Sequence, residues 1–228
     1  MRKILVIGAS GQIGNELTQA LREKYGGDNV IAADLKSPSG IIKNAGPFVP
    51  LDILDKETLS VQVCRHNVGT IYLLAAMLSA TGEQHPHKAW DLNMRSLLNT
   101  LEIARAANLE KVFWPSSIAV FGPDAPRLNC PQDAKLSPAT AYGISKSAGE
   151  DWCQYYLTKY GVDVRSLRFP GLISHQTLPG GGTTDYLSVG LAARQHLRHE
   201  ASRQQHQVSR RAHLQAAVLG KAHDVGRH

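Results

Sequence analysis

The chain has 228 residues, of which 43% are hydrophobic and 19% charged, a composition that suits a globular protein and excludes a wholly disordered or fibrous one. Most of its formal net charge of +6 lies in residues 190–228, which hold seven Lys/Arg against two Asp/Glu, so a nucleic-acid partner is not expected for the rest of the chain. No apolar run approaches the roughly 20 residues that cross a bilayer, and the three cysteines form no close pair. We therefore expect a cytoplasmic protein without a membrane segment, a disulfide framework or a metal site.

In chain order, short apolar runs alternate with segments of helical spacing. The runs predict strands at residues 2–8, 29–34, 70–75, 111–115 and 163–169, and the segments predict helices at residues 15–25, 55–67, 83–107 and 140–160. Asp55 is the expected N-cap of the second helix. Strands that alternate with helices of this length are parallel and joined by right-handed crossovers. The predicted fold class is α/β, a doubly wound parallel sheet of the Rossmann type.

A glycine-rich turn joins the first predicted strand to the first predicted helix. Gly8, Gly11 and Gly14 are spaced G-x-x-G-x-x-G, and Asp34 follows Gly14 by 20 residues at the end of the second strand. Glycines allow a dinucleotide pyrophosphate to approach the backbone and the free N–H groups of the helix. Asp34 would accept hydrogen bonds from the adenosine ribose and repel a 2′-phosphate, which favours NAD over NADP. The alternative is an ordinary glycine turn followed by a surface aspartate.

A second group of residues combines a phenol, an ammonium and a hydroxyl. Tyr142 and Lys146 are four residues apart on a predicted helix and thus share one face, and Ser117 follows the predicted strand at 111–115. A nearby cation stabilises a phenolate and lowers the pKa of the phenol, which would make Tyr142 a base near neutral pH. Ser117 could hydrogen-bond the reacting oxygen. The alternative is a solvated helix face.

With these two groups, the sequence resembles the extended short-chain dehydrogenase/reductase family. Further matching features are Asp52-Ile53, Leu74-Ala75-Ala76, Ser116 to Gly122 and Tyr142-x-x-x-Lys146. The resemblance implies that Ser117, Tyr142 and Lys146 are catalytic, Tyr142 as the acid/base. It implies cofactor contacts at Gly8, Gly11, Gln12, Ile13, Gly14, Asp34, Asp52, Ile53, Leu74, Ala75, Ala76, Tyr142, Lys146 and Pro170. Asn93 lies where the family has a helix residue near the site, and both a structural and a catalytic role are open.

A closer resemblance is to the L-threonine 3-dehydrogenases of this superfamily. It rests on Leu78-Ser79-Ala80 and on the segments 113–123, 168–174 and 179–186. It implies oxidation of the side-chain hydroxyl of L-threonine to 2-amino-3-oxobutyrate with NAD, and a homodimer formed through the helices at 83–107 and 140–160. The substrate contacts that it implies are Ser79, Ser117, Tyr142, Gly182, Thr183, Thr184 and Asp185. Asp185 could instead cap a helix, and Gly180–Gly182 could be a plain loop or a lid.

The resemblance ends near Val189, where family members continue with a smaller substrate domain. We expect an NAD-binding domain at residues 1–172, the start of the substrate-binding segment at 173–189, and a divergent, poorly ordered basic tail at 190–228. Most of the substrate domain is thus expected to be missing, and activity to fall below that of a complete relative. Two origins of the tail are open, a shifted reading frame or a lineage-specific arm. Two other functions are open: a nucleotide-sugar epimerase or dehydratase, and a non-catalytic nucleotide-binding remnant.

Overall fold

A computed structural model of the protein describes residues 2–37 and 41–172. They form a six-stranded parallel sheet with the strand order β3-β2-β1-β4-β5-β7 and a separate parallel pair, β6-β8. The strands are β1 (Lys3–Ile7), β2 (Val30–Asp34), β3 (Phe48–Pro50), β4 (Val68–Leu73), β5 (Lys111–Phe113), β6 (Ser116–Ser117), β7 (Val164–Arg165) and β8 (Arg168–Phe169). This order confirms the predicted doubly wound α/β fold. The predictions for residues 173–189 and 190–228 concern residues outside the described part.

The helices follow the predicted pattern with shifted boundaries. They are α1 (Gln12–Tyr25), α2 (Ile41–Asn44), α3 (Lys56–Arg65), α4 (Ser79–Gln84), α5 (Pro86–Ala106) and α6 (Ala141–Tyr160), with 3-10 turns at Gly27–Asn29 and Ile118–Val120. Asp55 is the N-cap of α3, as predicted, and accepts a hydrogen bond from Thr58 N. The sequence analysis missed β3, β6, α2 and α4, and it merged β7 and β8 into one strand.

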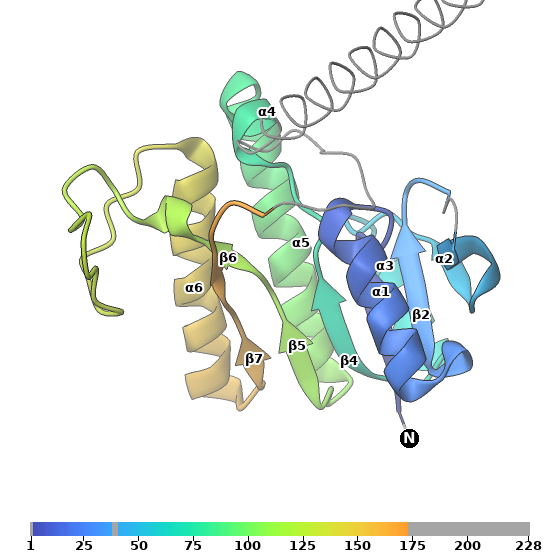
Figure 1. Ribbon diagram of the computed structural model, residues 1–228. Coiled ribbons are helices and arrows are strands. Elements are labelled where there is room, and N and C mark those ends of the chain that lie inside the picture. Colours follow the sequence, from blue (N-terminus) through green and yellow to red (C-terminus); the bar gives the residue numbers. More distant parts are fainter. Residues whose placement is uncertain (1, 38–40, 173–228) are drawn as a thin grey trace, which may run out of the picture. The chain divides into compact units, whose positions relative to one another are not determined.

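Two helical layers cover the sheet (Figure 1). Alternate residues of the central strand point to opposite faces, so Leu5 and Ile7 belong to one core and Ile4 and Val6 to the other. The first core packs against α3, α5 and α6, and the second against α1 and α2. In the described part of the chain, no helix combines the length and the apolar content that a bilayer crossing requires.

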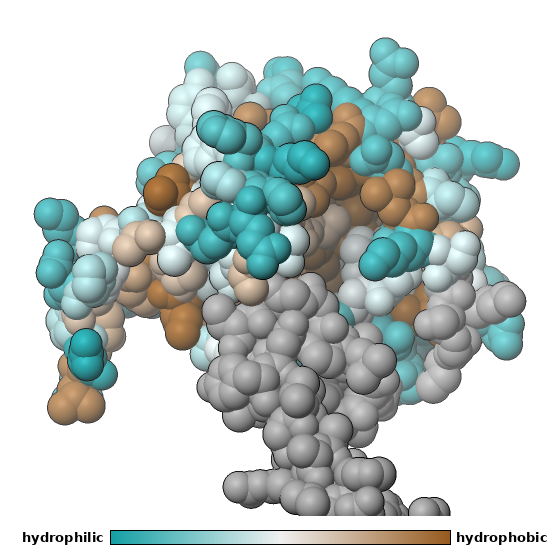
Figure 2. Space-filling model, turned by 90° about the horizontal axis from the view of Figure 1, so that it is seen from above, coloured by the Kyte–Doolittle hydropathy of each residue, from teal (hydrophilic) through white to brown (hydrophobic). Residues whose placement is uncertain are grey.

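The chain reverses its direction of winding between β1 and β4, which are neighbours at the centre of the sheet. Sheets of this type bind ligands outside the carboxyl ends of the strands at such a point. In Figure 1 the strands run upward, so this edge lies at the top of the view. Figure 2 looks onto it and shows hydrophobic side chains bordered by hydrophilic ones. The fold therefore indicates a binding site formed by the loops after β1, β2, β4 and β5.

Candidate functional site

The glycine-rich turn after β1 is packed so tightly that side chains would not fit. Gly8 has a positive φ of 86°, and a Cβ atom there would lie 2.6 Å from Ala75 N, on the loop after β4. A Cβ atom on Gly14 would lie 2.0 Å from the carbonyl oxygen of Gly8. The turn therefore brings bare backbone to the centre of the sheet edge, between β1 and β4.

The start of α1 has the properties of an anion-binding site. Its N-cap is Gly11, so no side chain of the described residues caps the first N–H groups of the helix. Asp34 lies beside the turn, where its carboxylate accepts hydrogen bonds from Ser10 N at 2.9 Å and Lys36 N at 3.0 Å. These two bonds orient Asp34 at the end of β2. Bare glycines, free N–H groups and an oriented carboxylate fit the pyrophosphate and ribose of a dinucleotide.

The other predicted cofactor contacts line the same edge. Leu74 N donates to Ile7 O at 2.8 Å, which joins the segment Leu74-Ala75-Ala76 to the end of β1. Gln12 Nε2 reaches Leu172 O at 3.5 Å, so the segment that contains Pro170 ends at the glycine turn. Ile53 is buried and Asp52 is exposed, one strand further along the sheet beyond Asp34. Ile13 is half-buried in the first turn of α1.

Ser117, Tyr142 and Lys146 come together, as the spacing predicts. The side chain of Ser117, at the end of β6, lies beside the Tyr142 phenol and favours its ionised form. Lys146 Nζ lies 5.5 Å from the centroid of the Tyr142 ring. The hydroxyl, the phenol and the ammonium thus form one cluster, on the side of the sheet edge that follows β5.

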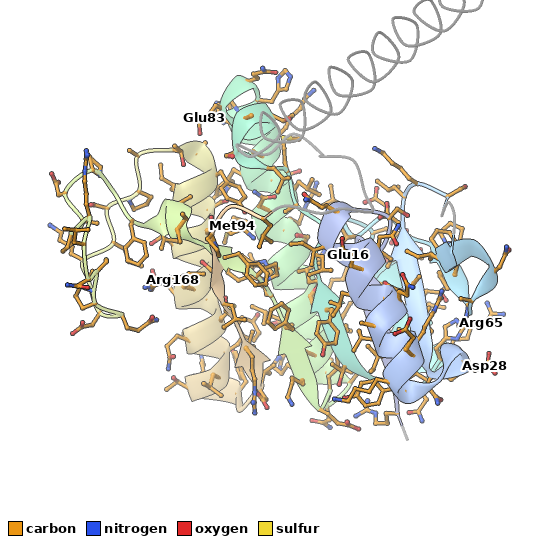
Figure 3. All side chains as sticks on the ribbon, viewed as in Figure 1. Glu16, Asp28, Arg65, Glu83, Met94 and Arg168 are labelled. Atoms are coloured by element: carbon orange, nitrogen blue, oxygen red, sulfur yellow. The ribbon has the colours of Figure 1, made fainter. Side chains whose placement is uncertain are left out.

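The position of Tyr142 depends on how α6 begins. Thr140 Oγ1 accepts from Gly143 N at 2.9 Å, and Glu83 at the end of α4 (Figure 3) accepts from Ala141 N at 2.6 Å. A Cβ atom on Gly143 would lie 2.2 Å from Ala119 O. The absence of a side chain at 143 lets the first turn of α6 touch the 3-10 turn after Ser117. The sequence analysis treated position 143 as one of the unspecified residues between Tyr142 and Lys146 and assigned it no role.

Lys146 is buried, with 2% of its surface exposed. Its ammonium donates to Pro115 O at 2.6 Å and lies 4.2 Å from the centroid of the Trp114 ring. No carboxylate of the described residues forms an ion pair with it. Removal from water disfavours the charged form, and burial lowers the pKa of Lys146 to about 7.

Burial acts on Tyr142 as well. It raises the pKa of the phenol above its usual value, although the side chain of Ser117 acts in the opposite direction. The sequence analysis expected the neighbouring ammonium to lower this pKa. In the protein alone that expectation is wrong, because loss of hydration outweighs the other contributions.

Asn93, whose role the sequence left open, joins two parts of the site. Its side chain accepts from Met77 N at 2.8 Å, donates to Met77 O at 3.1 Å and donates to Ser145 Oγ at 3.3 Å. Met77 lies between the cofactor segment 74–76 and Ser79, the first residue of α4. Asn93 is 2% exposed, and its three bonds make it a structural link between this loop and α6.

A polar network that the sequence analysis missed holds β6 and β8 to α6. Arg168 (Figure 3) forms two hydrogen bonds to the carboxylate of Glu150, at 2.7 and 2.9 Å, and Ser116 Oγ donates to the same group at 2.5 Å. Ser116 directly precedes Ser117. These partners lie 18 to 34 residues apart in sequence, so no local sequence pattern predicts their contact. The predicted substrate contacts Gly182, Thr183, Thr184 and Asp185 lie outside the described residues.

Comparison with known proteins decides the family. The family model described as NAD dependent epimerase/dehydratase family matches residues 4–200. The chain belongs to this family. Its description confirms the prediction of NAD as the cofactor, and it agrees with the fit of the glycine turn to a dinucleotide.

Among curated members of the epimerase/dehydratase family, a protein of Staphylococcus epidermidis is 53% identical over 188 residues, and one of Staphylococcus saprophyticus is 52% identical over 188 residues. Both bear the name uncharacterized epimerase/dehydratase. These alignments cover 82% of this chain and 58% of each relative. The chain therefore spans little more than half the length of the curated relatives that it matches.

Solved structures of similar proteins confirm the predicted resemblance to L-threonine 3-dehydrogenases. The holo form of a GalE-like L-threonine dehydrogenase from Cupriavidus necator is 55% identical, with a TM-score of 0.78 over 81% of this chain and 59% of that one. L-threonine dehydrogenase from Clostridium difficile is 49% identical, with a TM-score of 0.78 over 82% of this chain and 59% of that one. UDP-glucose 4-epimerase from Thermotoga maritima is more distant, at 25% identity and a TM-score of 0.67 over 73% and 54%.

The close packing of the glycine turn leads to a prediction about cofactor affinity. In the variant Gly14→Ala, the added methyl group would collide with Gly8 O and force the turn open. We expect the affinity for NAD to fall by more than about tenfold in isothermal titration calorimetry. Gly82→Ala is the matched control, because a Cβ atom there lies 3.4 Å from Ala89 Cβ, at an ordinary contact distance. Equal affinities of the two variants would contradict this account of the turn.

Proposed function

We propose that the protein catalyses NAD-dependent oxidation of the side-chain hydroxyl of L-threonine to 2-amino-3-oxobutyrate. The observation that carries the proposal is the cluster in which the Ser117 hydroxyl lies beside the Tyr142 phenol while Lys146 lies against the same ring. Such a cluster serves proton transfer to and from an alcohol. The 49 to 58% identity to proteins solved as L-threonine dehydrogenases supports the choice of substrate.

The three side chains divide the work of proton transfer. Tyr142, as the phenolate, takes the proton from the substrate hydroxyl. Ser117 donates a hydrogen bond to the same substrate oxygen as it becomes a carbonyl, which stabilises the charge that develops there. Lys146 supplies the opposite charge that a buried phenolate needs. Bound NAD supplies the hydride acceptor, and the residues proposed to hold it are those of the glycine turn, Asp34 and the segment after β4.

Recognition of the amino acid is proposed for a separate set of residues. Ser79, at the first position of α4, would border the substrate on the side of the loop that Asn93 holds. The other proposed contacts are Gly182, Thr183, Thr184 and Asp185. Hydroxyl and backbone N–H groups suit the carboxylate of threonine, and Asp185 suits its ammonium group.

A second candidate function is that of a nucleotide-sugar epimerase or dehydratase. The observation that favours it is the similarity to UDP-glucose 4-epimerase from Thermotoga maritima. The comparison of substrates separates the two candidates: NADH formed from threonine and NAD supports the dehydrogenase, and conversion of UDP-glucose without net NADH supports the epimerase. If neither reaction occurs while NAD still binds, the protein is the non-catalytic remnant that the sequence left open.

We also propose that the protein acts in the cytoplasm. Cys64 and Cys130 are exposed free thiols, and Cys153 is a buried one. Exposed thiols persist in a reducing compartment and are prone to oxidation outside it.

We propose a homodimer that forms through α5 and α6, the two adjacent helices at one side of the sheet (Figure 1). Large apolar side chains are exposed on these helices, namely Trp90, Trp152, Tyr155, Leu157 and Tyr160. Exposed apolar groups that gather on one face mark an interface, and a second copy with the same face completes it. We expect a dimer in sedimentation velocity and its loss in Trp152→Glu, with the far-ultraviolet circular dichroism unchanged. A monomeric wild-type protein would contradict the proposal.

The proton-transfer step is tested by removing one hydroxyl group. In Tyr142→Phe we expect threonine-dependent formation of NADH to fall by roughly 100- to 10,000-fold, because the base is lost. The affinity for NAD should stay within about twofold, since the ring remains in place. Tyr155→Phe, on an exposed turn of the same helix, is the control and should retain full activity. Activity of Tyr142→Phe equal to that of the wild type would refute the assignment of Tyr142 as the base.

A further inference from the structure

Trp114 is a buried aromatic residue within the segment 113–123, and the sequence analysis assigned it no role. It follows β5, is 2% exposed, and its backbone N–H donates to Arg165 O at 3.0 Å. Its ring centroid lies 4.2 Å from the Lys146 ammonium. An ammonium within about 6 Å of an indole face is attracted to the electron-rich ring, and the attraction grows when water is excluded.

The place of the indole ring is set by a glycine on the facing helix. A Cβ atom on Gly149 would lie 2.2 Å from Cη2 of Trp114 and 2.7 Å from Cζ2. Gly149 follows Lys146 by three residues, so both face the same strand from one side of α6. Because Gly149 has no side chain, the indole ring can pack against the backbone of α6 next to the lysine side chain. Two further groups face the ammonium: Pro115 O, at 2.6 Å, from the residue next to Trp114, and the Tyr142 ring, whose centroid lies 5.5 Å away.

We propose that Trp114 is a positioning residue of the proton-transfer cluster, whose indole ring, seated against Gly149, stabilises the charged form of Lys146 and holds it beside Tyr142. The proposal rests on the proposed function for the role of Lys146. The interaction itself can be measured without turnover. In the absence of a carboxylate partner among the described residues, the Trp114 ring, the Pro115 carbonyl oxygen and the Tyr142 ring are the groups that replace water around this charge.

The other titratable groups that the described residues place around Lys146 do not change their charge near neutral pH. Tyr142 on the same helix has a pKa raised by burial, and burial raises the pKa of the Cys153 thiol to about 12. The pKa of Glu150 is held below its usual value, where hydrogen bonds from Arg168 and Ser116 outweigh the effect of burial. A titration seen at Trp114 near neutral pH therefore reports Lys146.

The first experiment uses Trp114 as a fluorescent reporter in the full chain. The protein has three tryptophans, and the double variant Trp90→Phe/Trp152→Phe leaves Trp114 alone. We expect its emission to titrate with a midpoint near pH 7, as the ammonium beside the ring loses its proton. Adding Lys146→Met should abolish this titration. The proposal would be overturned if the emission of Trp114 did not change with pH in the double variant. It would also be overturned if the same midpoint remained after Lys146→Met was added.

The second experiment measures the effect of the ring on the lysine. The Lys146 titration is followed by NMR of protein with ¹³C-labelled lysine and assigned with Lys146→Met. In Trp114→Leu we expect the midpoint to fall by roughly 0.5 to 1 pH unit, because the charged form loses the aromatic face. Trp114→Phe should restore most of that difference, and Tyr25→Leu, at an exposed position at the end of α1, should leave the midpoint unchanged.

The outcomes separate this proposal from the proposed function. A folded Trp114→Leu protein with the wild-type midpoint, or a higher one, would overturn the proposal whether or not threonine is oxidised. If the Lys146 midpoint falls as predicted in Trp114→Leu but the protein does not oxidise threonine, the proposal for Trp114 is supported and only the substrate assignment is contradicted. If the Trp114 variants do not fold, the fluorescence titration and its loss in Lys146→Met decide alone.

Discussion

The site depends on a lysine ammonium that is removed from water without a carboxylate partner in the described part of the chain. A buried charge is tolerated only when other groups replace its hydration. For Lys146 these groups are the Pro115 carbonyl and the faces of Trp114 and Tyr142. Burial disfavours the ammonium and the phenolate when each is charged alone. Burying both opposite charges together costs less free energy than burying each one alone, because they attract each other strongly where water is excluded.

Close backbone contacts bring these groups into place. Gly8 and Gly14 let β1, the loop after β4 and the start of α1 meet at the sheet edge, and Gly143 lets α6 touch the turn after Ser117. Gly149 does the same for the ring of Trp114. The contacts of Gly8 with Ala75 and of Gly149 with Trp114 join segments that follow different strands. The loops of the site thus lie along one edge of the sheet. The glycines allow these loops to approach closely enough to bring the site residues together.

Much of the fold and the pairing of the main site residues could be predicted from the sequence. Apolar β-branched runs located the central strands, and the four-residue spacing placed Tyr142 and Lys146 on one helix face. β3 escaped because it has only three residues and ends in Pro50, which gives no periodic signal. The start of α1 was predicted three residues late because glycine at position 14 masks a helix. The contact of Trp114 with Lys146 and the direction of the Tyr142 pKa could not be predicted, since both depend on burial between distant segments.

The central claim is that the Lys146 ammonium stabilises the phenolate form of Tyr142 inside the site, so that this form can be reached. Its most direct test is the pKa of Tyr142, measured by NMR of ¹³C-labelled tyrosine in NAD-saturated protein, for the wild type and for Lys146→Met. The account predicts a higher pKa of Tyr142 in Lys146→Met, because the buried phenolate then has no cation beside it on α6. An equal or lower pKa in that variant would contradict it.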